Sequence, residues 1–140
     1  MAVYLHFYKI KVITINKQLI SKWIELIINN HKREAGEINI IFTNNYFIKE
    51  LNKQYLKRNY TTDIITFDFN NQNIISGDLY ISVDQVYNNS IEYNSKFLNE
   101  VYRVIIHGIL HLLGFNDQNE KERSIMREQE NSCLKELENL

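Results

Sequence analysis

Apolar residues recur at helical spacing in several stretches of the chain. The first stretch follows Asn16, whose side chain can cap a helix, and Gly36 is expected to mark where that helix stops. Its apolar stripe consists of Leu19, Ile20, Trp23, Ile24, Ile27 and Ile28. Further helices are predicted from 44 to about 56, from 84 as a short helix, from about 95 to 113, and from about 118 to 137.

Other stretches alternate apolar and polar residues, which predicts β-strands. These stretches cover residues 3–8, 37–43, 62–69 and 77–83, and a polar run at 70–73 predicts a turn. Strands alternate with helices early in the chain and helices fill its end, which favours an α+β fold with a four-stranded mixed sheet and about five helices. The chain has 140 residues, enough for one sizeable core, so a single domain over 1–140 is predicted.

The stretch from 95 to 113 is apolar almost all round, which is typical of a central helix that is covered on most sides. Its polar residues form one stripe that contains Glu100, Arg103, His107 and His111. We expect this stripe to face a cleft. We also expect Arg103 to pair with Glu100, because residues three apart are neighbours on a helix.

The segment from His107 to Asp117 carries the most specific chemical signal in the sequence. His107 and His111 are four residues apart, so their side chains lie on the same face of a helix. Gly114 can end the helix in a left-handed turn and return the chain so that Asp117 approaches the two imidazoles. Two nitrogens and one carboxylate oxygen are a sufficient ligand set for a catalytic zinc, with the fourth position left for water. The sequence therefore predicts a metal site formed by His107, His111 and Asp117.

Other interpretations of this segment stay open. A histidine in an apolar helix is usually a hydrogen-bonded core residue, although such a helix does not need two in register before a glycine and an acid. Two histidines and a carboxylate also describe the ligand set of non-haem iron enzymes. Helical zinc peptidases have a glutamate base after the first histidine, and Gly108 at this position disfavours a peptidase. Glycine costs about 1 kcal/mol relative to alanine inside a helix, so we expect a second backbone or a substrate to approach Gly108 closely.

Composition excludes several classes of protein. The chain is 44% hydrophobic and 12% aromatic, which is typical of a folded globular protein. Its N-terminus lacks the pattern of a signal peptide, and no apolar run reaches the roughly 18 residues of a membrane span. Cys133 is the single cysteine, so it suits a reducing cytoplasm and is expected to be a small buried residue. Because the net charge is −1, nucleic-acid binding would need a local basic patch.

Four segments together resemble the YbeY family of bacterial endoribonucleases, and the resemblance covers nearly the whole chain. They are residues 51–55, 62–67, 77–82 and 107–117, of which the last is the most specific. The resemblance implies a zinc-dependent endoribonuclease, specific for single strands, that acts in 16S ribosomal RNA 3′-end maturation and ribosome quality control. It also implies one zinc ion per chain, held by the last segment. Ribosomal RNA and the small ribosomal subunit are the implied partners, and neither DNA nor a membrane is expected. A ribosome-assembly RNA-binding module with a mainly structural metal is the alternative.

The chain departs from the family pattern at two positions. The third ligand position is usually a histidine and is Asp117 here, which is still a suitable zinc ligand but adds a full negative charge. Water at such a site should be less acidic than beside three imidazoles, which predicts a higher pH optimum than in a three-histidine relative. The family arginine that follows the tyrosine matched by Tyr55 is replaced by Leu56, and Arg58 is not equivalent to it in the alignment.

Substrate contacts are expected near the second helix. Lysines recur there every four residues and form a basic stripe, which consists of Lys49, Lys53 and Lys57 and is extended by Arg58. Tyr55 and Tyr60 are candidates for stacking on unpaired bases. An ordinary solvated helix face is the alternative interpretation of the stripe.

The general base is not determined by the sequence. Asp63, Asp68 and Asp78 are each a candidate for a base or for an acceptor that orients a ligand imidazole. The last helix, from about 118 to 137, is expected to be structural.

Overall fold

Four strands form one mixed sheet in the computed structural model, which describes residues 2–57 and 62–140. The strands are β1 (Ala2–Phe7), β2 (Glu34–Thr43), β3 (Ile64–Asp68) and β4 (Ile74–Ser82). Their order is β1-β2-β4-β3, with β1, β2 and β4 parallel and β3 antiparallel to β4. The predicted mixed sheet is confirmed.

Five α-helices and one π-helical turn accompany the sheet within the described residues. They are α1 (Lys17–Asn30), α2 (Asn45–Leu51), the π-turn η1 (Asn52–Leu56), α3 (Val83–Glu92), α4 (Phe97–Leu112) and α5 (Glu120–Glu138). The predicted cap at Asn16 is confirmed, because its side chain accepts a hydrogen bond of 3.0 Å from the backbone N–H of Leu19. None of the helices in this part of the chain combines the length and the hydropathy needed to cross a membrane.

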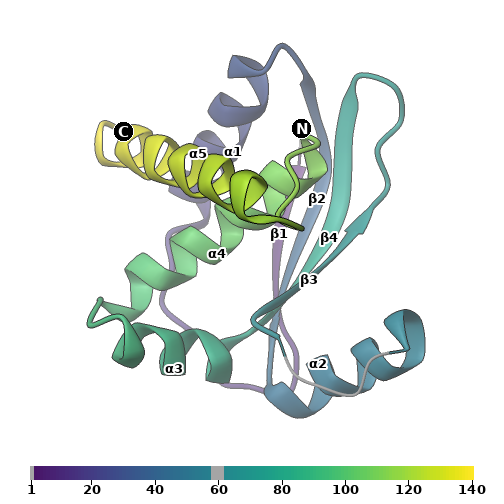
Figure 1. The fold of residues 1–140 in the computed structure, drawn as a ribbon, viewed down its shortest axis with the longest axis vertical. Helices are drawn as coiled ribbons and strands as arrows, with labels where there is room; N and C mark the ends of the chain where they lie inside the picture. The colour runs from purple at the N-terminus through teal and green to yellow at the C-terminus, as the bar shows by residue number, and fades with distance from the viewer. Residues whose placement is uncertain (1, 58–61) are drawn as a thin grey trace.

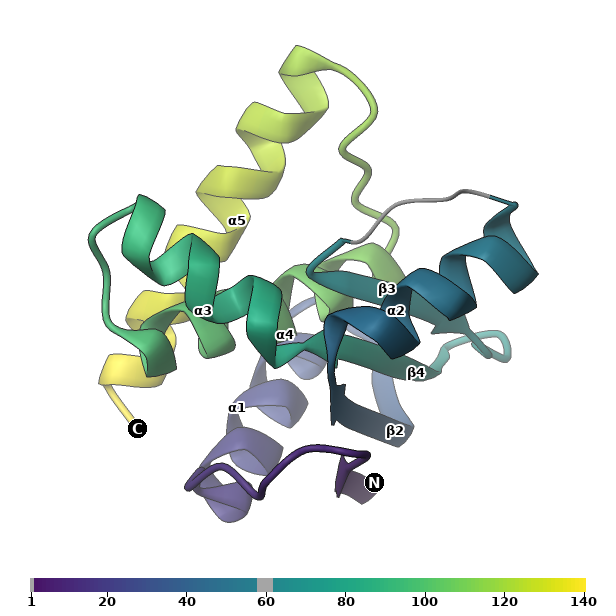
Figure 2. The same cartoon turned by 90° about the horizontal axis from the view of Figure 1, so that it is seen from below.

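The helices lie on both faces of the sheet (Figures 1 and 2). α1 and α4 cover one face, where Ile40, Leu79 and Ile105 are fully buried in the main core. The alternate residues of the strands point to the other face, where α2 packs over Ile65 and Tyr80 in a smaller cluster. The α+β architecture therefore places α4, the helix with the two histidines, directly against the sheet.

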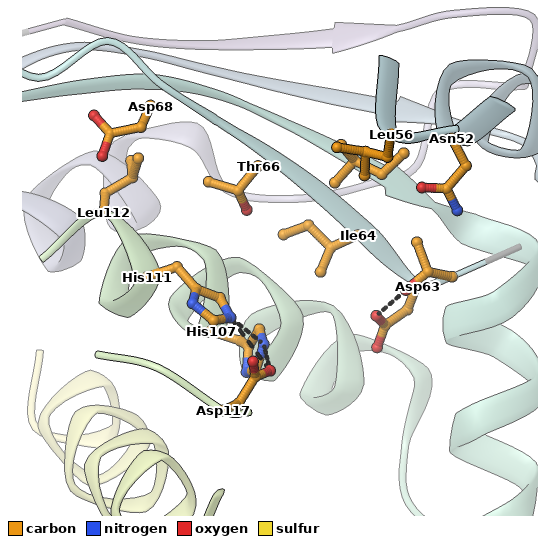
Figure 3. A pocket seen from close by; sticks show the side chains of 12 residues that line it. Asn52, Leu56, Asp63, Ile64, Thr66, Asp68, His107, His111, Leu112 and Asp117 are labelled. Atoms are coloured by element: carbon orange, nitrogen blue, oxygen red, sulfur yellow. Dashed lines mark hydrogen bonds and ion pairs between the residues drawn. The ribbon is translucent and has the colours of Figure 1, made fainter. Parts of the chain in front are cut away.

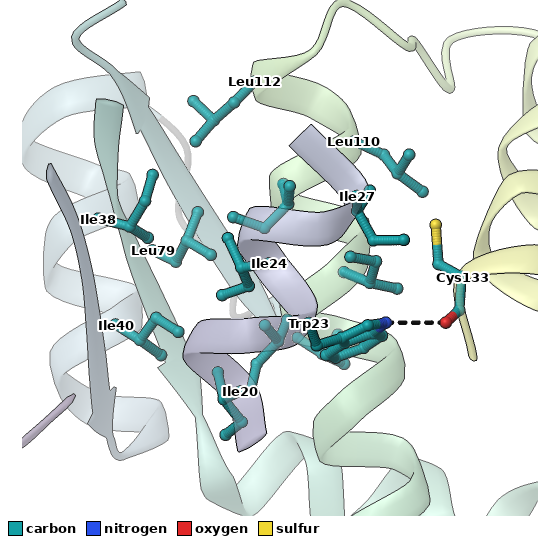
Figure 4. Close-up of a cluster of buried hydrophobic side chains, with 14 of the residues drawn as sticks. Ile20, Trp23, Ile24, Ile27, Ile38, Ile40, Leu79, Leu110, Leu112 and Cys133 are labelled. Carbon is teal, nitrogen blue, oxygen red and sulfur yellow. Dashed lines mark hydrogen bonds between the residues drawn. The ribbon is translucent and has the colours of Figure 1, made fainter. Parts of the chain in front are cut away.

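The final helix α5 is attached to the main core through Trp23 and Cys133 (Figure 4). The indole N–H of Trp23 donates a hydrogen bond of 2.8 Å to the backbone carbonyl of Cys133. The Cys133 side chain is buried, and burial raises the pKa of its thiol to about 12. The thiol is therefore neutral at physiological pH, and the prediction of a small buried residue is confirmed.

The first helix ends earlier than predicted. α1 stops at Asn30, and Lys32 adopts the left-handed conformation at φ 58° that was expected of Gly36. Gly36 lies inside β2, where a Cβ atom would collide with the Ser76 hydroxyl and lie 2.6 Å from Ile74 Cγ2. The register between β2 and β4 shifts beside this glycine, so the close approach of the two strands requires it. Both strands consequently begin three residues before their predicted starts.

Candidate metal centre

His107 and His111 occupy successive turns of α4, and their rings meet at one side of the helix (Figure 3). The two Nε2 atoms are 3.0 Å apart, and the ring planes are at 82° to each other. Both side chains are partly exposed, at 23% and 29%. The four-residue spacing thus produces the pair of convergent nitrogens that was predicted.

Asp117 reaches both histidines because the chain reverses after α4. Gly114 has a φ of +103°, and its backbone N–H donates to the carbonyl of His111 at 3.0 Å. This left-handed turn confirms the predicted role of the glycine. The Asp117 Oδ2 atom lies 3.3 Å from Nε2 of His107 and 3.3 Å from Nε2 of His111.

The spacing of the three donor atoms fits a tetrahedral metal ion. Zinc bonds of about 2.0–2.1 Å at tetrahedral angles separate neighbouring ligand atoms by roughly 3.4 Å. The observed separations are 3.0, 3.3 and 3.3 Å, and the three residues can all offer atoms within 4.8 Å of one another. Imidazole and carboxylate are common zinc ligands, and a set of three leaves one coordination position free. The three residues are therefore close enough together to hold a metal ion.

Glu130 is a functional candidate that the sequence analysis missed. It lies on α5, and its Oε2 atom is 2.6 Å from His107 Nδ1, on the side of the ring that faces away from the cluster. Burial of the ring lowers the pKa of His107, but the hydrogen bond to Glu130 and its negative charge raise it, and the net pKa is above the usual value. One feature of the sequence could have revealed Glu130. It is an acidic residue at helical spacing between Met126 and Cys133, on the face of the last helix that is buried.

The predicted pair between Arg103 and Glu100 is wrong. Arg103 instead donates from Nη1 to Glu130 Oε1 at 2.8 Å, and from Nη2 to Asn131 at 2.9 Å. Glu100 accepts a hydrogen bond of 3.0 Å from the Ser95 hydroxyl. Because α5 packs against α4, it brings the buried carboxylate of Glu130 within hydrogen-bond distance of Arg103, while Glu100 is held by Ser95.

Gly108 is explained by the sheet. A Cβ atom at this position would lie 2.8 Å from Ile64 Cδ1 and 2.9 Å from Leu79 Cδ2. The expected close approach is therefore observed, but it involves side chains of β3 and β4, and the expectation of a second backbone or a substrate is wrong. The absence of a side chain lets α4 lie close to the sheet.

A pocket of about 400 Å³ opens beside the cluster and contains all three of its residues (Figure 3). Asp63 and Asp68 line it, whereas Asp78 lies on the other face of the sheet and accepts from Asn39 at 3.1 Å. Burial raises the pKa of the Asp63 carboxyl, and the nearby charge of His107 lowers it by less. Asp63 and Asp68 therefore remain candidates for proton transfer, and Asp78 does not belong to this pocket.

The basic stripe does not follow one regular helix. The α-helical geometry ends at Leu51, the π-turn η1 follows, and Lys57 has a left-handed backbone at φ 54°. Lys53 and Lys57 are exposed next to the pocket-lining residues Asn52 and Leu56, but they do not line the pocket themselves. A π-turn of this kind is often found at functional sites. Arg58 and Tyr60 lie outside the described residues.

Comparison with known proteins gives consistent matches over most of the chain. A family model described as "Endoribonuclease YbeY" matches residues 7–138. A protein named Endoribonuclease YbeY from Azobacteroides pseudotrichonymphae genomovar. CFP2 is 46% identical over 124 residues, which cover 89% of each chain. A protein of the same name from Parabacteroides distasonis is 46% identical over 120 residues, covering 86% of this chain and 84% of that protein.

A solved structure supports the same fold. The solution structure of TM1509 from Thermotoga maritima aligns with a TM-score of 0.66 and 28% sequence identity. The alignment covers 97% of this chain and 89% of that chain.

Proposed function

Because the chain belongs to the endoribonuclease YbeY family, we propose that it is a zinc-dependent endoribonuclease that cleaves single-stranded RNA. We propose further that it acts as a single cytoplasmic domain in the maturation of the 16S ribosomal RNA 3′ end and in ribosome quality control. The observation that carries the proposal is the convergence of His107, His111 and Asp117 at the spacing of a zinc ligand set, inside a pocket.

The three residues of the cluster would hold one zinc ion per chain. A zinc ion bound there supplies Lewis-acid chemistry, which polarises a phosphoryl oxygen and makes water more acidic. The walls of the pocket around the cluster are formed by other side chains. Leu56 and Ile64 contribute apolar walls beside the cluster.

Asp63 is the carboxyl group best placed to move a proton in this pocket. It lines the pocket together with His107 and Asp117, and its pKa is raised mainly by burial. A carboxyl group whose pKa lies closer to neutrality is a better general acid or base. Asp68 is exposed and accepts a hydrogen bond of 2.8 Å from the backbone N–H of Asn70, so its environment resembles that of an ordinary surface carboxylate.

Cleavage of matched RNA substrates tests the proposed activity. We expect the zinc-loaded protein to cut a single-stranded RNA from the 3′ region of precursor 16S RNA, and to spare the same RNA annealed to its complement. Removal of the metal by a chelator should abolish cleavage, and added zinc should restore it. Intact RNA in every condition, with binding of RNA or ribosomal subunits retained, would contradict the nuclease proposal and favour an RNA-binding module.

The charge of Asp117 is expected to set the pH optimum. In Asp117→His, a neutral ligand replaces an anionic one, so the local charge becomes more positive and water at the site becomes more acidic. We expect the pH–rate profile to move to lower pH by on the order of one unit. Asp78→His is the matched control, since it makes the same change of side chain on the other face of the sheet, outside this pocket. An unshifted profile in Asp117→His would count against Asp117 as a ligand.

Lys53, Lys57 and Arg58 are proposed to contact RNA phosphates. If Lys53 makes one phosphate contact, Lys53→Glu should weaken RNA binding and reduce the slope of log affinity against log salt by roughly 0.7. Lys22→Glu is the control, because Lys22 is an exposed residue of α1 with the same charge. Equal affinities and equal salt slopes in both variants would remove Lys53 from the binding surface.

A further inference from the structure

A row of polar side chains leads from the surface of α5 to the metal cluster. Asn131 accepts from Arg103 at 2.9 Å, and Arg103 donates to Glu130 Oε1 at 2.8 Å. The other oxygen of Glu130 is 2.6 Å from Nδ1 of His107. Each carboxylate oxygen of Glu130 thus has one charged or ionisable partner, and the side chain is only 8% exposed.

The contact with Glu130 determines which ring nitrogen of His107 carries the proton, and therefore which nitrogen has a free lone pair. An ionised carboxylate only accepts hydrogen bonds, so the Nδ1 atom of His107 must carry the proton of this bond. In the neutral imidazole the lone pair is then on Nε2, which is the atom that points at His111 and Asp117. Glu130 therefore selects the tautomer of His107 that can bind a metal.

Arg103 orients Glu130 and balances its negative charge. A buried carboxylate is costly without partners, and the guanidinium provides both a positive charge and a directed N–H group. His111 differs from His107, because the described residues offer its Nδ1 atom no hydrogen-bond partner. The two histidines of the cluster thus differ in how firmly their rings are held.

We propose that Glu130, held by Arg103, is a positioning residue that fixes the tautomer and the ring orientation of His107 and so sets the affinity of the site for zinc. This inference rests on the proposed metal site. Outer partners of this kind typically change metal affinity by about 10–100-fold when they are removed. A role limited to joining α4 and α5 would affect folding but not the tautomer of His107.

Glu130→Gln tests the proposal in the full-length protein. Glutamine has a similar shape but only one acceptor oxygen. If that oxygen stays with Arg103, the amide NH₂ faces Nδ1 of His107, so the Nδ1–H contact is lost or the ring takes the tautomer with its lone pair on Nδ1. We expect zinc affinity, measured by competition with a chromophoric chelator, to fall by about 10–100-fold. In long-range ¹H–¹⁵N spectra of the metal-free protein, where no metal fixes the ring, we expect the Nδ1–H signal pattern of His107 to be weakened or replaced by that of exchanging tautomers.

Glu128→Gln is the matched control, because it removes the same charge from an exposed position of α5. Unchanged zinc affinity in Glu130→Gln, or an equal loss in Glu128→Gln, would overturn the proposal. If Glu130→Gln does not fold, Arg103→Lys carries the test, since lysine retains the charge and loses the planar fork. In that variant we expect a several-fold loss of zinc affinity, and no loss would overturn the proposal. Absence of zinc binding in the wild type would instead overturn the metal site itself.

Discussion

Replacement of His111 by alanine is expected to reduce the zinc content of the purified protein from nearly one ion per chain to a small fraction of that. His111 offers one of the three convergent donor atoms, and its Nε2 is 3.0 Å from that of His107 and 3.3 Å from Asp117. Loss of a direct ligand should lower zinc affinity by more than the roughly 100-fold upper range for an outer partner. RNA cleavage at limiting zinc should fall in parallel. The measurement is metal content by mass spectrometry, together with a cleavage assay.

Two further variants make this measurement specific. Asp117→Ala should also lose zinc if the carboxylate is the third ligand, whereas His6→Ala should retain it. His6 is a matched control because it lies on β1, where it bonds to Asn39 at 2.9 Å, and does not belong to the pocket. Zinc lost in His111→Ala but retained in Asp117→Ala would show that the third donor is elsewhere. Stoichiometric iron in the wild type would replace the zinc proposal with a non-haem iron centre.

Trp23→Ala is expected to have the largest effect on folding stability. The indole ring is fully buried, it packs at 6.0 Å from the Tyr102 ring in an edge-on arrangement, and its N–H bonds to the Cys133 carbonyl. Truncation of a buried tryptophan to alanine costs about 3–5 kcal/mol of unfolding free energy. For a chain of this size, such a loss corresponds to a decrease in Tm of roughly 10–20 °C. Urea unfolding followed by circular dichroism measures the change.

Two variants separate the causes of this loss. Trp23→Phe keeps most of the apolar contact but removes the indole N–H that bonds to the Cys133 carbonyl, so a smaller loss of about 1–3 kcal/mol is expected. Tyr87→Ala is the surface control, since Tyr87 is 54% exposed on α3, and it should change stability by no more than about 0.5 kcal/mol. A loss below about 1 kcal/mol in Trp23→Ala would contradict the view that α5 is anchored to the core through this residue.

The metal cluster could be predicted from the sequence because its three donors lie in one short segment, 107–117. A four-residue separation on a helix and a left-handed glycine determine local geometry, so the convergence of His107, His111 and Asp117 follows from neighbouring residues. The positions of most helices and strands followed in the same way from hydrophobic periodicity. Asn16 was identified as a cap because such a side chain bonds to a backbone N–H only three residues away.

The sequence by itself thus determined the α+β class, the central apolar helix and the three residues of the candidate metal cluster. Only the tertiary structure decided that Arg103 binds Glu130, that Gly108 makes room for Ile64 and Leu79, and that Gly36 belongs to a strand. Periodicity shows that a helix has a buried face, but it does not specify which element packs against that face or in what register. Partners that lie far apart in the chain are therefore set by the packing of α5 on α4 and of α4 on the sheet.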